Sequence, residues 1–298
     1  MKTKKVLSLS LTVTITAVML LTGCGSTNDG VIEDPTGEIT VISREDGSGT
    51  RGAFVELLGI EQKNEDGIKI DYTTLMAEVT NSTAVMIQSI YGNDNAIGYI
   101  SLGSMTDTIK AVSVDGVMPS IETVKDGSYP VARPFNIVYN ESSVDDVAKD
   151  FLTYVMSKQG QAIVEECGYV SQGNNGVYAV SGISGELTIG GSSSVTPVME
   201  KIAENYQELN PNVTIEVQQS DSTTGVQSVA EGVSDIGMAS RAIKEEEIAL
   251  GLTPMTIALD GIVVAIHREN ALENLTSEQV KDIYMGTITD WEDTYKEK

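Results

Sequence analysis

Short apolar runs rich in Val and Ile alternate along the chain with longer stretches in which apolar residues recur every three or four positions. The short runs predict buried strands, because β-branched side chains pack well on a pleated surface. The predicted strands are Glu38–Ser43, Ala96–Ser101, Ala111–Val114, Phe135–Tyr139, Glu186–Gly190, Val213–Gln218 and Thr256–Ile266. The alternation of the two patterns predicts an α/β fold.

The longer stretches predict helices with recognisable ends. Thr196 is placed to cap a helix that has Pro197 at its first position, where the missing N–H of proline breaks no helical hydrogen bond. Residues Val144–Lys158 are amphipathic, and Gly160 is placed to end that helix. The stretch Ser171–Ser184 is rich in turn-forming residues and predicts a surface loop.

The first 24 residues have the composition of a targeting segment. A basic start is followed by the apolar stretch Val6–Leu20, which is short for a membrane span, and then by the lipobox-like Leu21–Cys24. We therefore expect a lipoprotein signal peptide, lipidation of Cys24 with palmitate, and a linker over residues 25–36. An ordinary secretory signal, in which Cys24 is incidental, is the alternative. A lipidated chain would be anchored to the cell membrane on its extracytoplasmic face.

Charge restricts the partners of the chain. A formal net charge of −24 argues against nucleic acid, whose binding requires clustered Lys and Arg. The same charge repels anions at long range, so any anion site must act through local dipoles and hydrogen bonds.

The residue types needed for catalysis or for a metal are scarce. One histidine, His267, lies at the end of an apolar run, where a structural role is expected, and Cys167 is the only cysteine besides Cys24. These two side chains cannot form a zinc cluster, and no disulfide can form within a chain anchored through Cys24. No Gly-x-Ser-x-Gly elbow and no Walker A motif occur. We expect neither an enzyme nor a bound metal or cofactor.

Candidate chemistry lies instead where a predicted strand leads into a predicted helix. Within Ser43–Arg51, residues Asp46–Thr50 place two glycines and two hydroxyls at a helix start, with Arg44 just before them and Asp46 close enough to orient it. Backbone N–H groups and the helix dipole favour an anion at such a position, and a guanidinium can hold two of its oxygens. Simple helix capping is the alternative, and the presence of Arg44 favours anion binding over it.

Three further junctions have the same design. They are Ser192–Val195, Gln219–Gly225, and the weaker Ala239–Arg241 ahead of an acidic helix. Any one of them could be only a helix cap, but four in one chain indicate an oxyanion site.

These motifs resemble those of the phosphate-binding lipoproteins of bacterial phosphate ABC importers, which have the two-lobed periplasmic-binding-protein (Venus flytrap) fold. The resemblance covers nearly the whole chain after the linker. It rests on Ser43–Arg51 (SREDGSGTR), Ala96–Ser101 (AIGYIS), Gly191–Pro197 (GSSSVTP), Ser220–Gly225 (SDSTTG), Asp235–Arg241 (DIGMASR) and Tyr284–Trp291 (YMGTITDW). The resemblance implies that inorganic phosphate is captured between two lobes and delivered to permease subunits in the membrane. A surface phosphate sensor or an adhesin of the same fold is the alternative.

The resemblance also assigns roles to single residues. Arg44 would donate to phosphate and Asp46 would support it. The other implied ligands supply hydroxyl or backbone N–H donors: Ser48, Gly49, Thr50, Ser193, Ser194, the Val195 amide and Ser222. Many members of the family have an aspartate at the fourth junction that accepts a proton from phosphate, whereas this chain has Ser240-Arg241. Ser240 is a supporting residue, and Asp46, Asp221 or a backbone carbonyl is left to accept the proton. Without an acceptor the site would discriminate poorly against sulfate.

The order of the motifs implies a circular permutation. Family members begin with the GSSSVTP-like motif and reach ITDW before SREDGSGTR, whereas this chain begins where ITDW would have led and ends at Ile288–Trp291. One lobe would then be continuous over residues 132–254, and the other would combine residues 37–131 with 255–298. A monomer is expected, with exchange of domains between chains as the alternative.

Overall fold

The computed structural model describes residues 35–295, so the signal peptide, Cys24 and most of the linker lie outside the described residues. The strands are β1 Thr40–Arg44, β2 Glu61–Lys63, β3 Lys69–Asp71, β4 Glu78–Thr80, β5 Ala96–Ser101, β6 Ile109–Val114, β7 Ala132–Tyr139, β8 Val170–Ser171, β9 Gly185–Ser192, β10 Val213–Ser220, β11 Ile236–Ala239, β12 Thr253–His267 and β13 Asn274–Leu275. Every predicted strand overlaps one of these.

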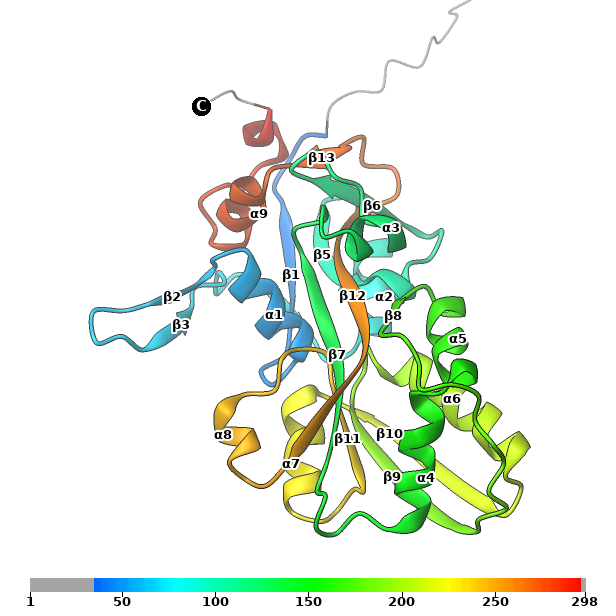
Figure 1. The fold of residues 1–298 in the computed structure, drawn as a ribbon. Coiled ribbons are helices and arrows are strands. Elements are labelled where there is room, and N and C mark those ends of the chain that lie inside the picture. The colour runs from blue at the N-terminus through cyan, green and yellow to red at the C-terminus, as the bar shows by residue number, and fades with distance from the viewer. Residues whose placement is uncertain (1–34, 296–298) are drawn as a thin grey trace, which may run out of the picture. The chain divides into compact units, whose positions relative to one another are not determined.

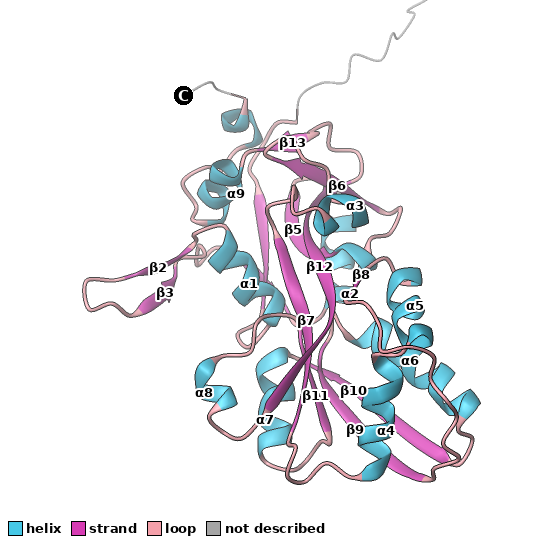
Figure 2. Cartoon of the chain, in the orientation of Figure 1, coloured by secondary structure: helices cyan, strands magenta, loops and turns pink. Residues whose placement is uncertain are grey.

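Along most of the sequence the helices alternate with the strands, and Figure 2 shows both kinds of element. They are α1 Gly49–Leu57, α2 Thr83–Tyr91, α3 Ile121–Lys125, α4 Asp146–Val155, α5 Lys158–Glu166, α6 Thr196–Leu209, α7 Ser222–Ala230, α8 Glu245–Ile248 and α9 Ser277–Tyr284, with 3-10 turns η1 Leu102–Ser104 and η2 Trp291–Thr294. The predicted α/β class is therefore confirmed.

One mixed sheet runs through the described residues in the order β10-β9-β11-β7-β12-β5-β1-β4, with β6, β8 and β13 attached beside this path. The long strand β12 joins its two parts (Figure 1). Residues Thr253–Gly261 of this strand pair with β7, and residues Ile262–Ile266 pair with β5. A single continuous strand thus belongs to both halves of the sheet.

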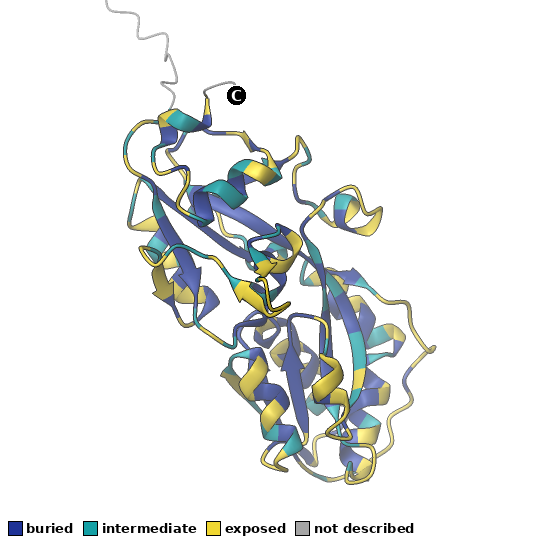
Figure 3. Cartoon of the chain, turned by 90° about the vertical axis from the view of Figure 1, so that its left-hand side faces the viewer, coloured by how far each residue is buried: buried dark blue, intermediate teal, exposed yellow. Residues whose placement is uncertain are grey.

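The buried side chains form two principal cores on either side of this crossover. One core contains Phe54, Tyr99 and Trp291, and the other contains Phe135 and Tyr206, among many others. The name "first lobe" is used below for the part built by β1, β5, β6, α1, α2 and α9. The name "second lobe" is used for the part built by β9, β10, β11 and α4 to α7. The strands are mostly buried, and the outward faces of the helices are exposed (Figure 3).

The two ends of the described chain lie side by side in the first lobe. The Ile39 amide donates to the Thr289 carbonyl at 2.8 Å, and the Trp291 amide donates to the Gly37 carbonyl at 3.1 Å. Glu38 and Asp290 form an antiparallel bridge between these two bonds.

The prediction of one helix over Val144–Lys158 is wrong, because two helices are present. Helix α4 ends at Val155, and Ser157 caps α5 by accepting a hydrogen bond from the Gly160 amide at 3.1 Å. Gly160 therefore lies in the first turn of α5 and ends no helix. A Cβ at this position would lie 2.3 Å from the Tyr154 carbonyl oxygen, so the close approach of the two helices requires glycine.

The predicted start of α6 is wrong by one residue. Val195 is the N-cap and Thr196 the first helical residue, so Pro197 stands second. The Thr196 hydroxyl donates to the Ser192 carbonyl at 3.1 Å and caps nothing at the N-terminus of its own helix.

Candidate functional site

Four junctions between a strand and a helix meet where the two lobes face each other. Arg44 ends β1, and Ser48 is the N-cap of α1, which begins with Gly49 and Thr50. The second lobe contributes the residues that follow β9, β10 and β11, which are Ser193, Ser194, Val195, Ser222 and Ser240. All nine residues are buried, including the guanidinium of Arg44, whose residue is 2% exposed.

Hydrogen bonds between the lobes show how closely these residues approach. Arg44 Nη2 donates to Ser193 Oγ at 3.1 Å, and the hydroxyls of Thr50 and Ser194 lie 2.8 Å apart. The Thr223 amide donates to the Gly47 carbonyl at 3.2 Å. The structure therefore brings together the predicted first and second junctions in a closed arrangement.

The residues of the second lobe also bond among themselves. The Ser240 amide donates to Ser222 Oγ at 3.0 Å, and the Ser192 hydroxyl donates to Ser240 Oγ at 2.9 Å. Each hydroxyl can both donate and accept, so this cluster can reorganise around an oxyanion without leaving a buried group unpaired.

The predicted support of Arg44 by Asp46 is wrong. The carboxylate that holds Arg44 is that of Glu45, which accepts from Nε and from Nη2 of Arg44 at 2.7 Å each. The Asp46 side chain is 99% exposed and pairs with Arg51 at 3.0 Å. Glu45 thus fixes the guanidinium and balances its charge.

Two other predicted ligands already form hydrogen bonds within the protein. Ser48 Oγ accepts from the Arg51 amide at 3.3 Å, so this side chain is a helix cap, although its hydroxyl hydrogen remains a donor. The Val195 amide donates to the Ser192 carbonyl at 3.0 Å. The structure therefore does not support the predicted role of the Val195 amide as an anion donor.

Thr83 belongs to the same cluster and was missed from the sequence. Its hydroxyl lies 3.4 Å from Ser193 Oγ and 3.4 Å from Ser194 Oγ, and it is the first residue of α2. The available signal was Ser82-Thr83 ahead of an apolar helical stretch, a pair of hydroxyls at a helix start.

The fourth junction departs from the family pattern in a definite way. Arg241, which stands where an acceptor was sought, donates to both oxygens of Glu247 at 2.8 and 2.7 Å. Burial acts to raise the pKa of the Glu247 carboxyl, but the hydrogen bonds from Arg241 and from the Lys244 amide outweigh it and hold that pKa below its ordinary value. Arg241 is therefore committed to a structural pair.

A tyrosine supports the strand end that presents Arg44. Tyr99 Oη accepts from the Arg44 amide at 3.1 Å and lies 3.0 Å from Ser43 Oγ. Burial raises the pKa of Tyr99 to about 12, so the phenol remains neutral at physiological pH. The positive charge of Arg44 is thus not offset by a phenolate.

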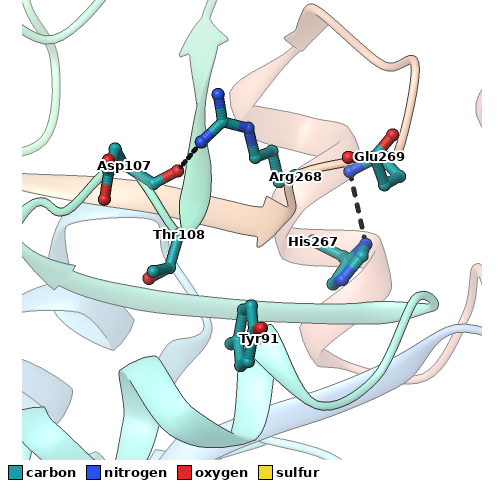
Figure 4. A pocket seen from close by; sticks show the side chains of 6 residues that line it. All are labelled: Tyr91, Asp107, Thr108, His267, Arg268 and Glu269. Carbon is teal, nitrogen blue, oxygen red and sulfur yellow. Dashed lines mark hydrogen bonds between the residues drawn. The ribbon is translucent and has the colours of Figure 1, made fainter.

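A surface hollow of about 490 Å³ lies elsewhere, beyond the end of β12 (Figure 4). Tyr91, Asp107, Thr108 and the three residues from His267 to Glu269 line it, and the Glu269 amide donates to His267 Nδ1 at 3.3 Å. None of the predicted site residues lines this hollow. Its mixture of two acids, two bases and an exposed aromatic ring lacks the converging hydroxyls of the junctions.

Within residues 35–295, no group of three or more His, Cys, Asp or Glu side chains is placed to hold a metal ion. No helix in this same part of the chain is long and apolar enough to cross a membrane. Cys167 is a free thiol of intermediate exposure, and burial raises its pKa.

A two-lobed α/β fold whose polar strand–helix junctions face each other is the architecture of the periplasmic solute-binding class. The model of the PBP superfamily domain matches residues 28–159 and 176–298. The phosphate-binding protein PstS 2 of Streptococcus agalactiae is 45% identical over 296 residues, which cover 99% of this chain and 100% of that protein. The PstS 2 protein of Streptococcus pneumoniae is 42% identical over 273 residues, 91% of this chain and 93% of that protein.

A solved structure agrees with these sequences. The crystal structure of the phosphate-binding protein of a phosphate ABC transporter from Streptococcus pneumoniae has 43% identity and a TM-score of 0.70, and the match covers 87% of this chain and 100% of that one. The chain therefore belongs to the PBP superfamily and, within it, to the family of PstS phosphate-binding proteins. The resemblance noted from the sequence is confirmed, and so is the two-lobed periplasmic-binding-protein fold.

Proposed function

We propose that this chain is the extracytoplasmic binding protein of a phosphate ABC importer, which captures inorganic phosphate between its lobes and delivers it to the permease subunits. The observation that carries the proposal is the buried guanidinium of Arg44 in the first lobe, which donates to Ser193 of the second. A buried guanidinium that Glu45 holds in place, next to hydroxyls of the opposite lobe, supplies charged and neutral donors to a small oxyanion that both lobes enclose. The names of the relatives support phosphate as that oxyanion.

In this proposal Arg44 supplies the charged donor, oriented by Glu45. The further donors are Ser48, Gly49 and Thr50 of the first lobe with Thr83, and Ser193, Ser194 and Ser222 of the second lobe, with Ser240 in support. The N-termini of α1, α6 and α7 add partial positive charge. The protein makes and breaks no covalent bond of phosphate, so it is no enzyme, and hinge motion of the lobes binds and releases the ion.

The hydroxyl oxygens of Ser222 and Ser240 are the groups that we expect to accept the phosphate O–H, since Arg241 cannot. A hydroxyl accepts from phosphate but can equally donate to sulfate. We therefore expect sulfate to compete measurably with phosphate.

Lipidation of Cys24 and anchoring at the outer face of the cell membrane complete the proposal, with the lipobox as their support. The folded part is expected to act as a monomer.

We also propose that the chain is a circular permutant with lobes over residues 132–254 and over residues 37–131 plus 255–298, corrected only in that residues 255–258 of β12 pack in the core of the second lobe. Support comes from the hydrogen bonds that join Gly37 and Ile39 to Thr289 and Trp291, because the two chain ends are then near enough to be linked. A rearranged gene that links the residues after Trp291 to Gly37, and opens the chain in the Ser171–Ser184 loop, tests this. It should give a folded protein with unchanged phosphate affinity, and a rearranged chain that fails to fold would contradict the proposal.

Calorimetric titration of phosphate into the unlipidated chain tests the function, with Arg44→Ala as the variant and sulfate as competitor. Arg268→Ala is the matched control, because it removes the same charge outside the site. We expect binding of one phosphate per chain that is lost in Arg44→Ala and retained in Arg268→Ala. Absence of phosphate binding to the folded wild-type chain would refute the proposal, and half a phosphate per chain would indicate exchange of domains between chains.

A further inference from the structure

Two charged residues that the site does not use lie at the crossover between the lobes. Arg133 of β7 and Asp260 of β12 are directly opposite register partners, and their side chains are 1% and 0% exposed. Nε and Nη2 of Arg133 donate to Asp260 Oδ2 at 3.1 and 2.9 Å. The desolvation of a buried ion pair offsets its attraction, so the presence of the pair is weak evidence that it stabilises the fold.

The pair lies where β7 and β12 pass from one lobe to the other, which is the place in the sheet where a hinge is expected. On β7, Ala132 packs against the core of the first lobe and Phe135 belongs to the core of the second. On β12, Ile257 belongs to the second core and Ile262 to the first. The pair therefore lies on the two strands that both lobes share, and hinge motion need not separate its members.

Each member of the pair extends to a different lobe. Asp260 Oδ1 accepts from the Ser101 hydroxyl at 2.8 Å and from the Leu102 amide at 3.1 Å, at the end of β5 in the first lobe. Arg133 Nη1 donates to the Ser240 carbonyl at 3.0 Å, at the end of β11 in the second lobe. The hydrogen bonds thus form a continuous path from one lobe to the other.

The end of this path in the second lobe is a residue of the anion site. The Ser240 amide donates to Ser222 Oγ, and Ser240 Oγ accepts from Ser192. A Cβ on Gly49 would lie 2.8 Å from Ser240 Oγ, so Ser240 faces the first lobe directly. Ser240 belongs to no helix or strand, and its bond to Arg133 is therefore important for holding its backbone in place.

We propose that Arg133 is a positioning residue for anion binding, which without touching the anion holds Ser240 in the site and, through Asp260, sets the angle at which the lobes close. This inference rests on the proposed function. Partners of direct ligands have comparable roles in metal sites, where their loss weakens binding about 10- to 100-fold.

Arg133→Lys is the main test variant. Lysine keeps the charge beside Asp260 but has one amino group in place of the fork that reaches Asp260 and Ser240 together. Arg241→Lys is the matched control, because Arg241 is also a buried arginine paired with a carboxylate and is adjacent to Ser240 in the sequence, yet its pair with Glu247 lies outside β7 and β12. Asp260→Asn, which keeps the shape of the side chain, replaces Arg133→Lys if that variant does not fold.

Two measurements decide the question, with thermal unfolding as the check on folding. Phosphate calorimetry should show binding about 10- to 100-fold weaker in Arg133→Lys and changed less than about threefold in Arg241→Lys. In the phosphate-free proteins, hydrogen exchange by mass spectrometry over residues 236–244 should be about tenfold faster at Ser240 in Arg133→Lys than in wild type.

A purely structural role would lower the melting temperature of Arg133→Lys and leave both measurements unchanged, and this result would overturn the proposal. If the wild-type chain binds no phosphate, the proposed function fails, whereas the exchange rates still decide whether Arg133 holds Ser240.

Discussion

Gly49 of the first lobe lies directly against Ser222 of the second. A Cβ at Gly49 would lie 2.2 Å from Ser222 Oγ and 2.9 Å from Ser222 Cβ, both shorter than side chains tolerate. Both residues begin helices, so the N-termini of α1 and α7 can approach this closely only because position 49 has no side chain. This contact makes the identity of residue 49 a determinant of closure.

Gly49→Ala should therefore weaken phosphate binding by at least about tenfold, which corresponds to about 1.4 kcal/mol. The added methyl group separates the lobes, whereas the open protein tolerates it, since alanine favours a helix over glycine by about 0.5–1 kcal/mol. We expect calorimetry to show weaker binding and urea unfolding without phosphate to show unchanged or higher stability.

Gly52→Ala is the control in the same helix. A Cβ at Gly52 meets only Arg241 Cδ, at 3.8 Å, which is ordinary contact. This variant should keep its phosphate affinity. Equal loss of affinity in both variants would show that helix composition, and not contact between the lobes, governs binding.

Glu45 and Asp46 should differ in their importance although they are neighbours of the same charge. Glu45→Ala removes both hydrogen bonds that fix Arg44, and we expect about tenfold weaker phosphate binding, because charge-assisted bonds of this kind contribute about 1.5–3 kcal/mol. Asp46→Ala removes only an exposed partner of Arg51 and should change affinity less than about twofold. Tighter binding in Glu45→Ala would show that its negative charge opposes the anion more than its contacts help.

The strand–helix junctions could be predicted from the sequence because their chemistry is local. A hydroxyl or glycine at a helix start serves the unpaired backbone N–H groups of the first turn, which lie within three or four residues of it. The pattern around Ser48, Ser193 and Ser222 can therefore be recognised in the sequence. The family resemblance then identified which junctions belong to one site.

The partner of Arg44 could not be predicted in this way. Glu45 and Asp46 both follow the strand, and the choice between them depends on the directions in which the loop turns their side chains. Asp46 is drawn to Arg51, which itself donates to the Arg44 carbonyl at 2.9 Å, and this leaves Glu45 beside the guanidinium. The pair of Arg133 with Asp260 could not be predicted for a related reason. The two residues are 127 positions apart in the sequence, and they become neighbours because β7 pairs with β12.

Thr83→Val tests the junction that the sequence did not reveal. The valine keeps the shape of threonine but removes the hydroxyl next to Ser193 and Ser194, so phosphate binding should weaken about 3- to 10-fold, the cost of one lost hydrogen bond. Ser82→Ala is the neighbouring control, because it removes the N-cap of α2 and should lower the free energy of unfolding by about 1 kcal/mol. An unaffected affinity in Thr83→Val would exclude Thr83 from the site.

The pair of Arg241 with Glu247 predicts a specific dependence of stability on pH. A carboxyl whose pKa is lower in the folded state contributes stability above its unfolded pKa, and the contribution is lost as the pH falls through the folded pKa. Glu247→Gln should therefore lower the free energy of unfolding at pH 7 by about 1–3 kcal/mol. Its deficit relative to wild type should shrink below pH 4.5, the ordinary pKa of glutamate, as Glu247 of the wild type becomes protonated.

Urea unfolding between pH 7 and about pH 3 measures this difference. Glu246→Gln is the control, since its side chain on the same helix is 75% exposed and its stability curve should follow that of wild type. A deficit in Glu247→Gln that stays constant over the whole range would mean that the amide group of glutamine disturbs the turn after Ser240, and that the charge of Glu247 does not stabilise it.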